Sequence, residues 1–498
     1  MSPSSFLLLG ILLSSFATGC VIFFLREESH RLRTGLNLAG AGLKIVFVAL
    51  LLRGVLGGEV FELTFTMAPG MVLALGADAN SVLFVTLSSV LWFLTTLYAV
   101  GYLEDSPRRS RFFGFFSLCV TATVGIALAA NLLTFLIFYE LLTISTFPLV
   151  VHRGTRKALQ AGGIYLAYTI GAGTVLLLAV AWLQSIAGPV AFTERGALHA
   201  VVASHPTQLT VIFFLFIASF GVKSALVPLH GWLPRAMVAP APVSALLHAV
   251  AVVKAGAFGI VRLVYDVYGI ETAEQLGLLH PLAVMAGFTI IYGSILALGQ
   301  DDLKKRLAYS TVSQVSYITL GTAIFGPLAT IGGIVHLVHQ GIMKITLFFA
   351  AGNYAETLGI HRVSEMNGVG RRMPWTTAAF TIAALGMIGV PPLAGFVSKF
   401  YIKQGAITAG SEWVTLVLAA SSLLNAAYFL PILYRAWFLE PHQAWPNERD
   451  FGRFETNWML LLPPLFTAAM VVLAGVLADS DFSPLAWARI IAGREYGP

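Results

Sequence analysis

Apolar runs of about 20 residues recur along the whole chain, and each is long enough to cross a bilayer as a helix. Hydrophobic residues make up 57% of the 498 residues and charged residues only 11%. Soluble globular proteins carry about 25% charged residues, so the composition excludes that class. The runs predict an all-α polytopic membrane protein with about 14 transmembrane helices. The predicted spans are 5–25, 36–54, 72–101, 113–130, 132–150, 160–184, 209–227, 241–263, 281–299, 307–325, 328–351, 375–403, 413–437 and 457–478.

Basic residues are distributed unevenly between the two sets of loops that join these spans. One set holds about 18 lysines and arginines, whereas the other set and both tails hold about 3. The basic set comprises 26–35, 104–112, 151–158, 228–240, 301–306, 353–374 and 439–456. The positive-inside rule places this set in the cytoplasm and both termini on the periplasmic side of the cell membrane. The net charge of +6 follows from these loops and does not indicate nucleic-acid binding.

Five charged side chains fall well inside the predicted spans: Glu140, Lys223, Lys254, Lys344 and Lys399. A charge at the bilayer centre costs at least about 2.5–3.5 kcal/mol, so such residues face the bundle interior or a water-filled cavity. A lone carboxylate at Glu140 would be neutral unless a cation lay nearby, so we expect a lysine from another helix beside it. The group predicts an ion pathway. The alternative is a buried ion pair that only fixes packing.

Other charged residues in the spans have simpler interpretations. Four lie near helix ends, where a long side chain can reach the membrane interface. They are Arg53, Arg262, Lys403 and Arg435. Asp78 begins the predicted third span, where the helix dipole favours a negative charge.

Proline and glycine interrupt two of the spans that carry these lysines. Pro228 follows Lys223, and Pro391 and Pro392 precede Lys399. Corresponding breaks in two halves of a chain indicate a transporter's site and an inverted repeat. We therefore expect a single membrane domain over 1–498. It comprises N-terminal helices in 1–112, a first five-helix repeat in 113–263, an inverted second repeat in 281–437 and a last helix in 457–478.

His336 and His339 precede Lys344 on one predicted helix. Their spacing would allow a shared metal, but no third ligand is apparent, so we expect no metal site. Imidazole changes charge near neutral pH, which favours a proton relay. Hydrogen bonding between helices without a transport role is the alternative. Cys20 and Cys119 lie in separate spans without C-x-x-C spacing, which argues against an iron–sulfur or zinc site.

Three motifs carry a resemblance to a known family. They are DDLKK followed by LAYSTVSQVSY from Asp301, the PLHGWLP stretch, and APVSALLHAVAVVKAG. The chain resembles the antiporter-like subunits of respiratory complex I, membrane-bound hydrogenases and Mrp-type cation/proton antiporters, and is most similar to the Mrp-type D subunit. The resemblance covers roughly the third to the thirteenth span. It departs from the family pattern at Arg235, which follows HGWLP, and at Gln340-Gly341, which follow His339.

The resemblance implies a proton-conducting subunit that works with other membrane subunits and possesses no cofactor or catalytic residue of its own. Glu140 would pair with Lys223, and the proton would pass through Lys254 and the region of His336, His339 and Lys344 to Lys399. The exchanged ion would be H⁺, with Na⁺ as its partner. Three alternatives stay open: the pumping arm of a redox enzyme, a partner that energises uptake of a solute such as inorganic carbon, and a scaffold with inert lysines.

Overall fold

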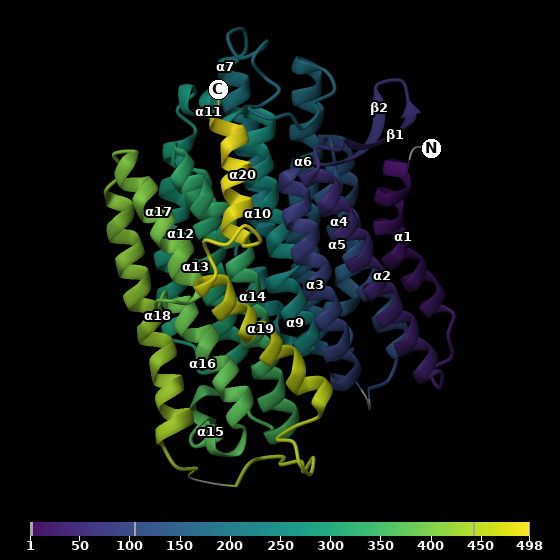
Figure 1. Ribbon diagram of the computed structural model, residues 1–498, viewed down its shortest axis with the longest axis vertical. Coiled ribbons are helices and arrows are strands. Elements are labelled where there is room, and N and C mark those ends of the chain that lie inside the picture. The colour runs from purple at the N-terminus through teal and green to yellow at the C-terminus, as the bar shows by residue number, and fades with distance from the viewer. Residues whose placement is uncertain (1–2, 104–105, 442–443, 498) are drawn as a thin grey trace.

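The computed structural model describes residues 3–103, 106–441 and 444–497, which form a bundle of long helices with one β-hairpin (Figure 1). The N-terminal elements are α1 (Pro3–Phe23), α2 (His30–Leu56), β1 (Phe61–Ala68), β2 (Met71–Ala77) and α3 (Ala79–Tyr102). The next are α4 (Arg109–Leu128), α5 (Leu132–Val150), α6 (Arg156–Ala187), α7 (Pro206–Lys223), α8 (Trp232–Arg235), η1 (Ala236–Val238), α9 (Ala241–Ala249), α10 (Val252–Arg262), η2 (Leu263–Tyr268) and α11 (Ile270–Gln275). The remainder are α12 (Leu279–Leu298), α13 (Leu303–Thr322), α14 (Pro327–Leu358), η3 (Val363–Glu365), α15 (Val369–Arg372), α16 (Pro374–Ile388), α17 (Ala394–Thr408), α18 (Trp413–Phe438), α19 (Trp458–Val476) and α20 (Pro484–Tyr496).

Twelve helical segments of the described chain are long and apolar enough to cross a membrane. Two further predicted spans fall outside this set for reasons visible in their sequences. Helix α13 is 20 residues long but polar, since it opens with Lys304 and Lys305 and continues with serine, threonine and glutamine. Helices α16 and α17 are 15 residues each and share one span between them. The all-α polytopic fold class is therefore confirmed, with 12 to 14 spans.

The third span begins later than predicted, and this is a correction. Residues 71–77 form strand β2, which pairs antiparallel with β1 around a turn at Gly70 (φ +78°). Helix α3 starts at Ala79, and the side chain of Asp78 accepts a hydrogen bond from the Ser81 N–H at 2.7 Å. The sequence predicts helix for the apolar run MVLALGA, because a short apolar segment carries no period that separates strand from helix.

The predicted breaks are present. Helix α7 ends at Lys223, and an irregular segment containing Pro228 leads to α8. Helix α16 ends before Gly389, and α17 begins after Pro391 and Pro392. A further interruption, at Val250–Ala251, separates α9 from α10. The sequence does not predict it, because neither residue is a proline.

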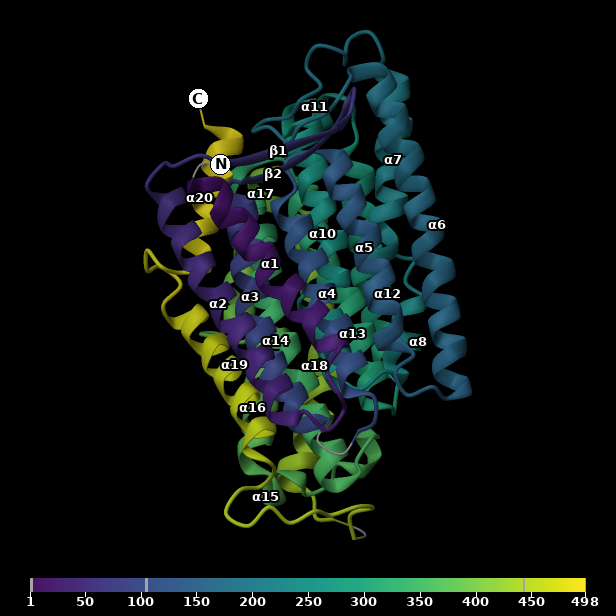
Figure 2. The same cartoon turned by 90° about the vertical axis from the view of Figure 1, so that its right-hand side faces the viewer.

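Both described ends of the chain lie at one end of the bundle, beside the hairpin (Figures 1 and 2). We call this the terminal end, and the opposite end, which holds α15, the basic end. Helix α4 leaves the basic end, whereas α12 follows α11 from the terminal end, so the two five-helix runs that they open point in opposite directions (Figure 1). The division at 113–263 and 281–437 stays a prediction.

Helix α20 was not predicted, because its 13 residues are too short to cross a bilayer. It packs against α14 and α3 at the terminal end. The indole N–H of Trp487 donates to the Ala79 carbonyl at 2.7 Å, which fixes α20 to the first turn of α3.

Candidate functional site

Lys223 is the last residue of α7, and its side chain is fully buried. Its ammonium donates to the backbone carbonyl of Tyr139 in α5 and lies 3.3 Å from the centre of the Tyr139 ring. The break after α7 frees the final carbonyls of the helix, and a helix C-terminus favours a cation. The buried lysine therefore lies where the helix ends inside the bundle.

Glu140 follows Tyr139 on α5, so the predicted Glu140 and Lys223 lie close together. No ion pair within 4.0 Å joins them among the described residues, and Lys223 instead contacts the preceding peptide carbonyl. The Oε1 atom of Glu140 is buried without a hydrogen-bond partner. Its carboxyl group lies against Gly173 of α6, where any side chain would collide with it. The arrangement places a carboxyl group near the lysine without a salt bridge that would lock both.

Lys254 lies on α10, directly after the interruption at Val250–Ala251, and is fully buried. Its ammonium donates to the Leu337 carbonyl of α14 at 2.7 Å. Gly256 lets α10 approach the end of α7. A Cβ atom there would lie 2.7 Å from the Phe220 carbonyl oxygen and 2.8 Å from the carbonyl carbon of Lys223. This close packing brings the Lys254 helix against the Lys223 peptide.

His336 precedes Leu337 and connects Lys254 to the second broken helix. Its Nδ1 atom lies 2.8 Å from the Ser398 hydroxyl of α17. The next residue, Lys399, donates to the carbonyls of Met387 and Ile388 at 2.9 Å each, at the end of α16.

The ring of Tyr317 lies 5.1 Å from the His336 ring and 5.3 Å from the Lys399 ammonium. Lys254, His336 and Lys399 therefore follow one another across α10, α14 and α17. We call Lys223, Lys254, His336 and Lys399 the central row.

The other two predicted residues of α14 are buried but are not hydrogen-bonded to the central row. Lys344 donates to the Ser310 hydroxyl and to the Leu307 carbonyl of α13, the latter at 3.3 Å. Neither ring nitrogen of His339 has a hydrogen-bond partner. Within the described part of the chain, no group of three metal-ligating side chains occurs. The roles predicted for these residues stay predictions.

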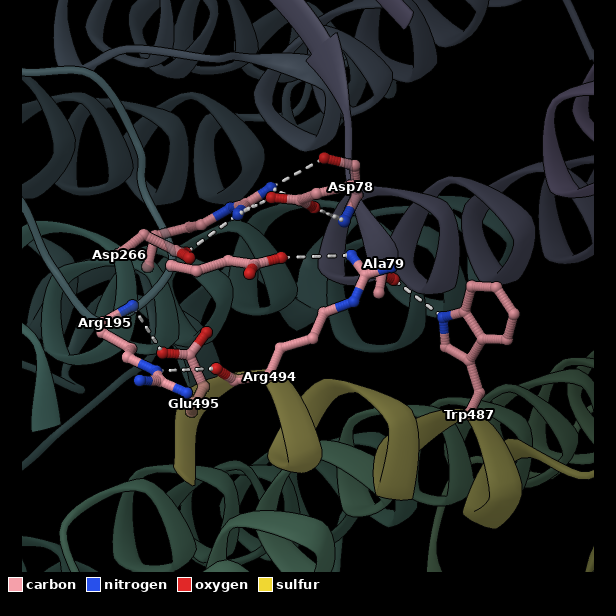
Figure 3. Close-up of polar contacts among 10 residues, drawn as sticks. Asp78, Ala79, Arg195, Asp266, Trp487, Arg494 and Glu495 are labelled. Atoms are coloured by element: carbon pink, nitrogen blue, oxygen red, sulfur yellow. Dashed lines mark hydrogen bonds and ion pairs between the residues drawn. The ribbon is translucent and has the colours of Figure 1, made fainter. Parts of the chain in front are cut away.

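Arg262 corrects the expectation that it extends to the membrane interface. It is only 2% exposed and lies between two aspartates. Its guanidinium donates to Asp266 at 2.8 Å and to the Ser81 hydroxyl at 2.7 Å, and it is paired with Asp78 (Figure 3). The spacing of Arg262 and Asp266, four residues apart at the end of a span, was the signal that could have found this cluster. Arg53 and Lys403 are exposed, as expected.

Comparison with known proteins decides the family. Residues 129–425 match the transmembrane family of NADH:quinone oxidoreductase and Mrp antiporter subunits. The chain belongs to this family. It is 34% identical over 402 residues to the N subunit of the NADH-quinone oxidoreductase of Desulforudis audaxviator, covering 78% of each chain. It is 27% identical over 483 residues to the D subunit of the Na⁺/H⁺ antiporter of Alkalihalophilus pseudofirmus, covering 96% of this chain and 95% of the other.

The fold of this family member agrees with solved structures. A chain of the Mrp complex from Dietzia sp. superposes with a TM-score of 0.86 at 24% identity, covering 100% of this chain and 98% of that one. A chain of respiratory complex I from Thermus thermophilus gives a TM-score of 0.81, also at 24% identity, covering 99% and 100%. The predicted resemblance is therefore confirmed, and the chain is an antiporter-like membrane subunit of the Mrp and complex I family.

Proposed function

We propose that this chain conducts protons as the D-type subunit of an Mrp-type antiporter, which exchanges H⁺ for a monovalent cation such as Na⁺. The central row is the observation that carries the proposal. Its three lysines are buried, and each donates to neutral oxygens and pairs with no carboxylate within 4.0 Å among the described residues. A lysine held in this way can release its proton without breaking a salt bridge, and lysine serves readily as a base when buried.

In this mechanism Glu140 controls the charge of Lys223 from the neighbouring position on α5. Movement of the Glu140 carboxyl group, or a change in its protonation, alters how strongly the protein favours the ammonium. The released proton passes to Lys254, then along His336 to Lys399, with water bridging the gaps. Lys344 and His339 hold or supply protons from the basic end. Each transfer moves one proton from donor to acceptor and needs no cofactor.

The extent of the sequence similarity favours the antiporter branch, because the alignment with the antiporter D sequence covers 96% of this chain. The second candidate is the proton-pumping subunit of a redox complex, and the 34% identity to an oxidoreductase N sequence favours it. Hard cations prefer several oxygen ligands, and Glu140 is the one acid within the predicted spans after α3. A Na⁺ path would therefore run through a partner subunit.

We further propose that the terminal end faces the periplasm and that the chain assembles with other membrane subunits. The strong excess of basic residues in the loops of the opposite end supports this orientation. Purification of the tagged chain from native membrane, followed by mass spectrometry, tests the assembly. Small hydrophobic antiporter subunits are the expected companions. Flavin, nickel or iron–sulfur subunits would favour the redox branch, and a chain that purified alone and still moved protons would contradict assembly.

Substitution of Lys223 tests proton conduction directly. We expect Lys223→Ala to lower H⁺ transport in membrane vesicles by about 100-fold, the scale of a lost proton-transfer group. Lys223→Arg should be nearly as damaging, because arginine keeps its proton in proteins.

The matched control is Lys403→Ala, which changes an exposed lysine of α17 and should leave transport unchanged. Full transport by the arginine variant would contradict deprotonation of Lys223. Full transport by both Lys223→Ala and Glu140→Gln would support the scaffold alternative.

A further inference from the structure

A second cluster of buried charged groups lies at the terminal end, where the unpredicted helix α20 meets η2. Glu495 of α20 is 3% exposed, and Asp266 of η2 is 4% exposed. The Glu495 carboxylate accepts a hydrogen bond from the Arg195 N–H at 3.1 Å, and the Asp266 carboxylate accepts one from Arg262 at 2.8 Å (Figure 3). Two nearly buried carboxyl groups thus meet beside arginines, at the end of the bundle where α10 and η2 finish.

A chain of three hydroxyl groups joins η2 and α20, the two elements that carry the cluster, to α14, the helix of His336. The Tyr265 hydroxyl lies 2.8 Å from that of Thr330, and the Thr330 hydroxyl lies 3.0 Å from that of Tyr496. Tyr265 precedes Asp266, and Tyr496 follows Glu495. Thr330 lies on α14 six residues before His336, which is about 9 Å along the helix. Hydroxyl groups both donate and accept hydrogen bonds, so such a chain can hand a proton on.

Two cavities lie near this connection. A small one between α3, α10 and α14 is lined by apolar side chains apart from Asn80, and it adjoins Leu337, whose carbonyl accepts from Lys254. An apolar cavity of this kind stays dry, so it holds no proton path. A larger cavity of about 330 Å³ is lined by Asp78 and Arg262 and by Glu194 and Arg494, two charged neighbours of Glu495.

We propose that Glu495, Asp266 and Tyr496 form the port through which the central row exchanges protons with water at the terminal end. The proposal rests on the proton conduction proposed above and names the residues of its outer half. A proton arriving from Lys254 or His336 passes along α14 to the Thr330 hydroxyl, with water bridging the distance. Each hydroxyl accepts one proton and gives up its own, and Glu495 passes the last one to the solvent. The Glu495 carboxylate is restored, and no co-reactant is consumed.

The electrostatic surroundings of Glu495 suit this role. Its burial and the neighbouring charge of Asp266 raise the pKa of Glu495 to about 8. A carboxyl group with that pKa takes up and releases a proton near neutral pH, whereas an ordinary surface glutamate stays ionised. The charged groups around Glu495 are Asp266 of η2, Glu194 and Arg195 of the loop before α7, Arg262 of α10 and Arg494 of α20 itself.

Two substitutions test the port in vesicles that contain the whole assembly. Glu495→Gln removes the proton acceptor but keeps the shape of the side chain. Tyr496→Phe removes one hydroxyl but keeps the ring that packs 5.7 Å from Phe325. H⁺ transport is measured while the pH at the terminal face is varied between 6 and 9 with the other face held constant. The matched control is Asp479→Asn, since Asp479 is exposed and pairs with Arg489, a residue of α20.

We expect the unchanged protein to show an inflection near pH 8 in this profile and Glu495→Gln to lose it. Both port variants should transport protons about tenfold more slowly or worse, and Asp479→Asn should match the unchanged protein. If the cluster only fastened α20, Tyr496→Phe would change neither rate nor profile. Retention of rate and profile by Glu495→Gln and Tyr496→Phe, while Lys223→Ala stops transport, would overturn the port and leave proton conduction intact. Normal transport by Lys223→Ala would instead refute the function on which the port rests.

Discussion

The buried charged side chains of this protein are of two kinds. The lysines of the central row donate to backbone carbonyls and, for Lys399, also to the Ser422 hydroxyl at 3.2 Å, so their charge is not fixed by a carboxylate partner. Arg262 is held on both sides by carboxylates and by a serine hydroxyl. Arginine stays charged under all ordinary conditions and forms several directed hydrogen bonds. Lysine therefore occurs where the proposed mechanism moves a proton, and arginine occurs where a charge must stay.

Removal of Arg262 would leave Asp266 buried without its partner. We expect Arg262→Gln to destabilise the protein by about 3–5 kcal/mol, the usual cost of breaking a buried ion pair from one side. The measurement is thermal unfolding of the purified assembly in detergent. The double variant Arg262→Gln with Asp266→Asn should recover much of this loss, because no uncompensated charge remains. Equal stability of the single variant and the unchanged protein would show that the cluster does not stabilise the fold.

Helices in the centre of the bundle are interrupted beside the lysines of the central row, and one of them ends where Lys399 needs free backbone carbonyls. The carbonyls of Met387 and Ile388, at the end of α16, accept from Lys399 across the break. Lys254 lies just after the interruption between α9 and α10. Irregular backbone at membrane depth is stable only where protein or cavity water satisfies it. At the second break the Lys399 ammonium does so, whereas Lys223 and Lys254 lie beside their breaks and donate to carbonyls inside α5 and α14.

Close contact between α10 and α7 depends on Gly256, and this predicts a steric effect. A methyl group there would lie 2.7 Å from the Phe220 carbonyl oxygen, closer than van der Waals contact allows. We expect Gly256→Ala to separate the two helices, to cost about 1–3 kcal/mol of stability and to slow H⁺ transport.

The matched control for Gly256→Ala is Gly163→Ala in α6, because no atom lies within 4 Å of a Cβ at Gly163. Alanine is the better helix former, so this variant should be unchanged or slightly more stable. Thermal unfolding and vesicle transport compare the two variants. Equal behaviour of both would contradict the close-packing role of Gly256.

At the scale of the whole molecule, the two ends of the bundle differ in the elements and the charged residues that they hold. The terminal end holds the hairpin, α20 and a cluster in which carboxyl groups meet arginines (Figures 1 and 3). The basic end holds the loops rich in lysine and arginine. The central row lies between the two, across α7, α10, α14 and α17. The proposed proton conduction needs access from both faces, and in this layout the residues at the two faces differ in charge.

Orientation in the membrane can be tested by labelling in a variant that lacks Cys20 and Cys119. Pro69→Cys lies in the exposed hairpin turn, and Asp450→Cys lies in an exposed loop of the basic end. We expect a membrane-impermeant maleimide added to intact spheroplasts to label the cysteine at 69. The cysteine at 450 should react only after permeabilisation, because basic loops stay in the cytoplasm. The reverse pattern would invert the proposed topology.

The sequence by itself determined the membrane class, most span positions, the breaks around Pro228 and Pro391–Pro392, and the buried lysines. Hydropathy and the cost of burying a charge are properties of short segments, and they need no knowledge of distant contacts. The tertiary structure alone decided that Lys254 contacts the Leu337 carbonyl, that His336 contacts Ser398, and that the buried Arg262 pairs with Asp78. It also decided the hairpin and the place of α20. These contacts of Lys254 and His336, and the one that fixes α20, join residues between 62 and 408 positions apart, and packing rather than local pattern selects such partners.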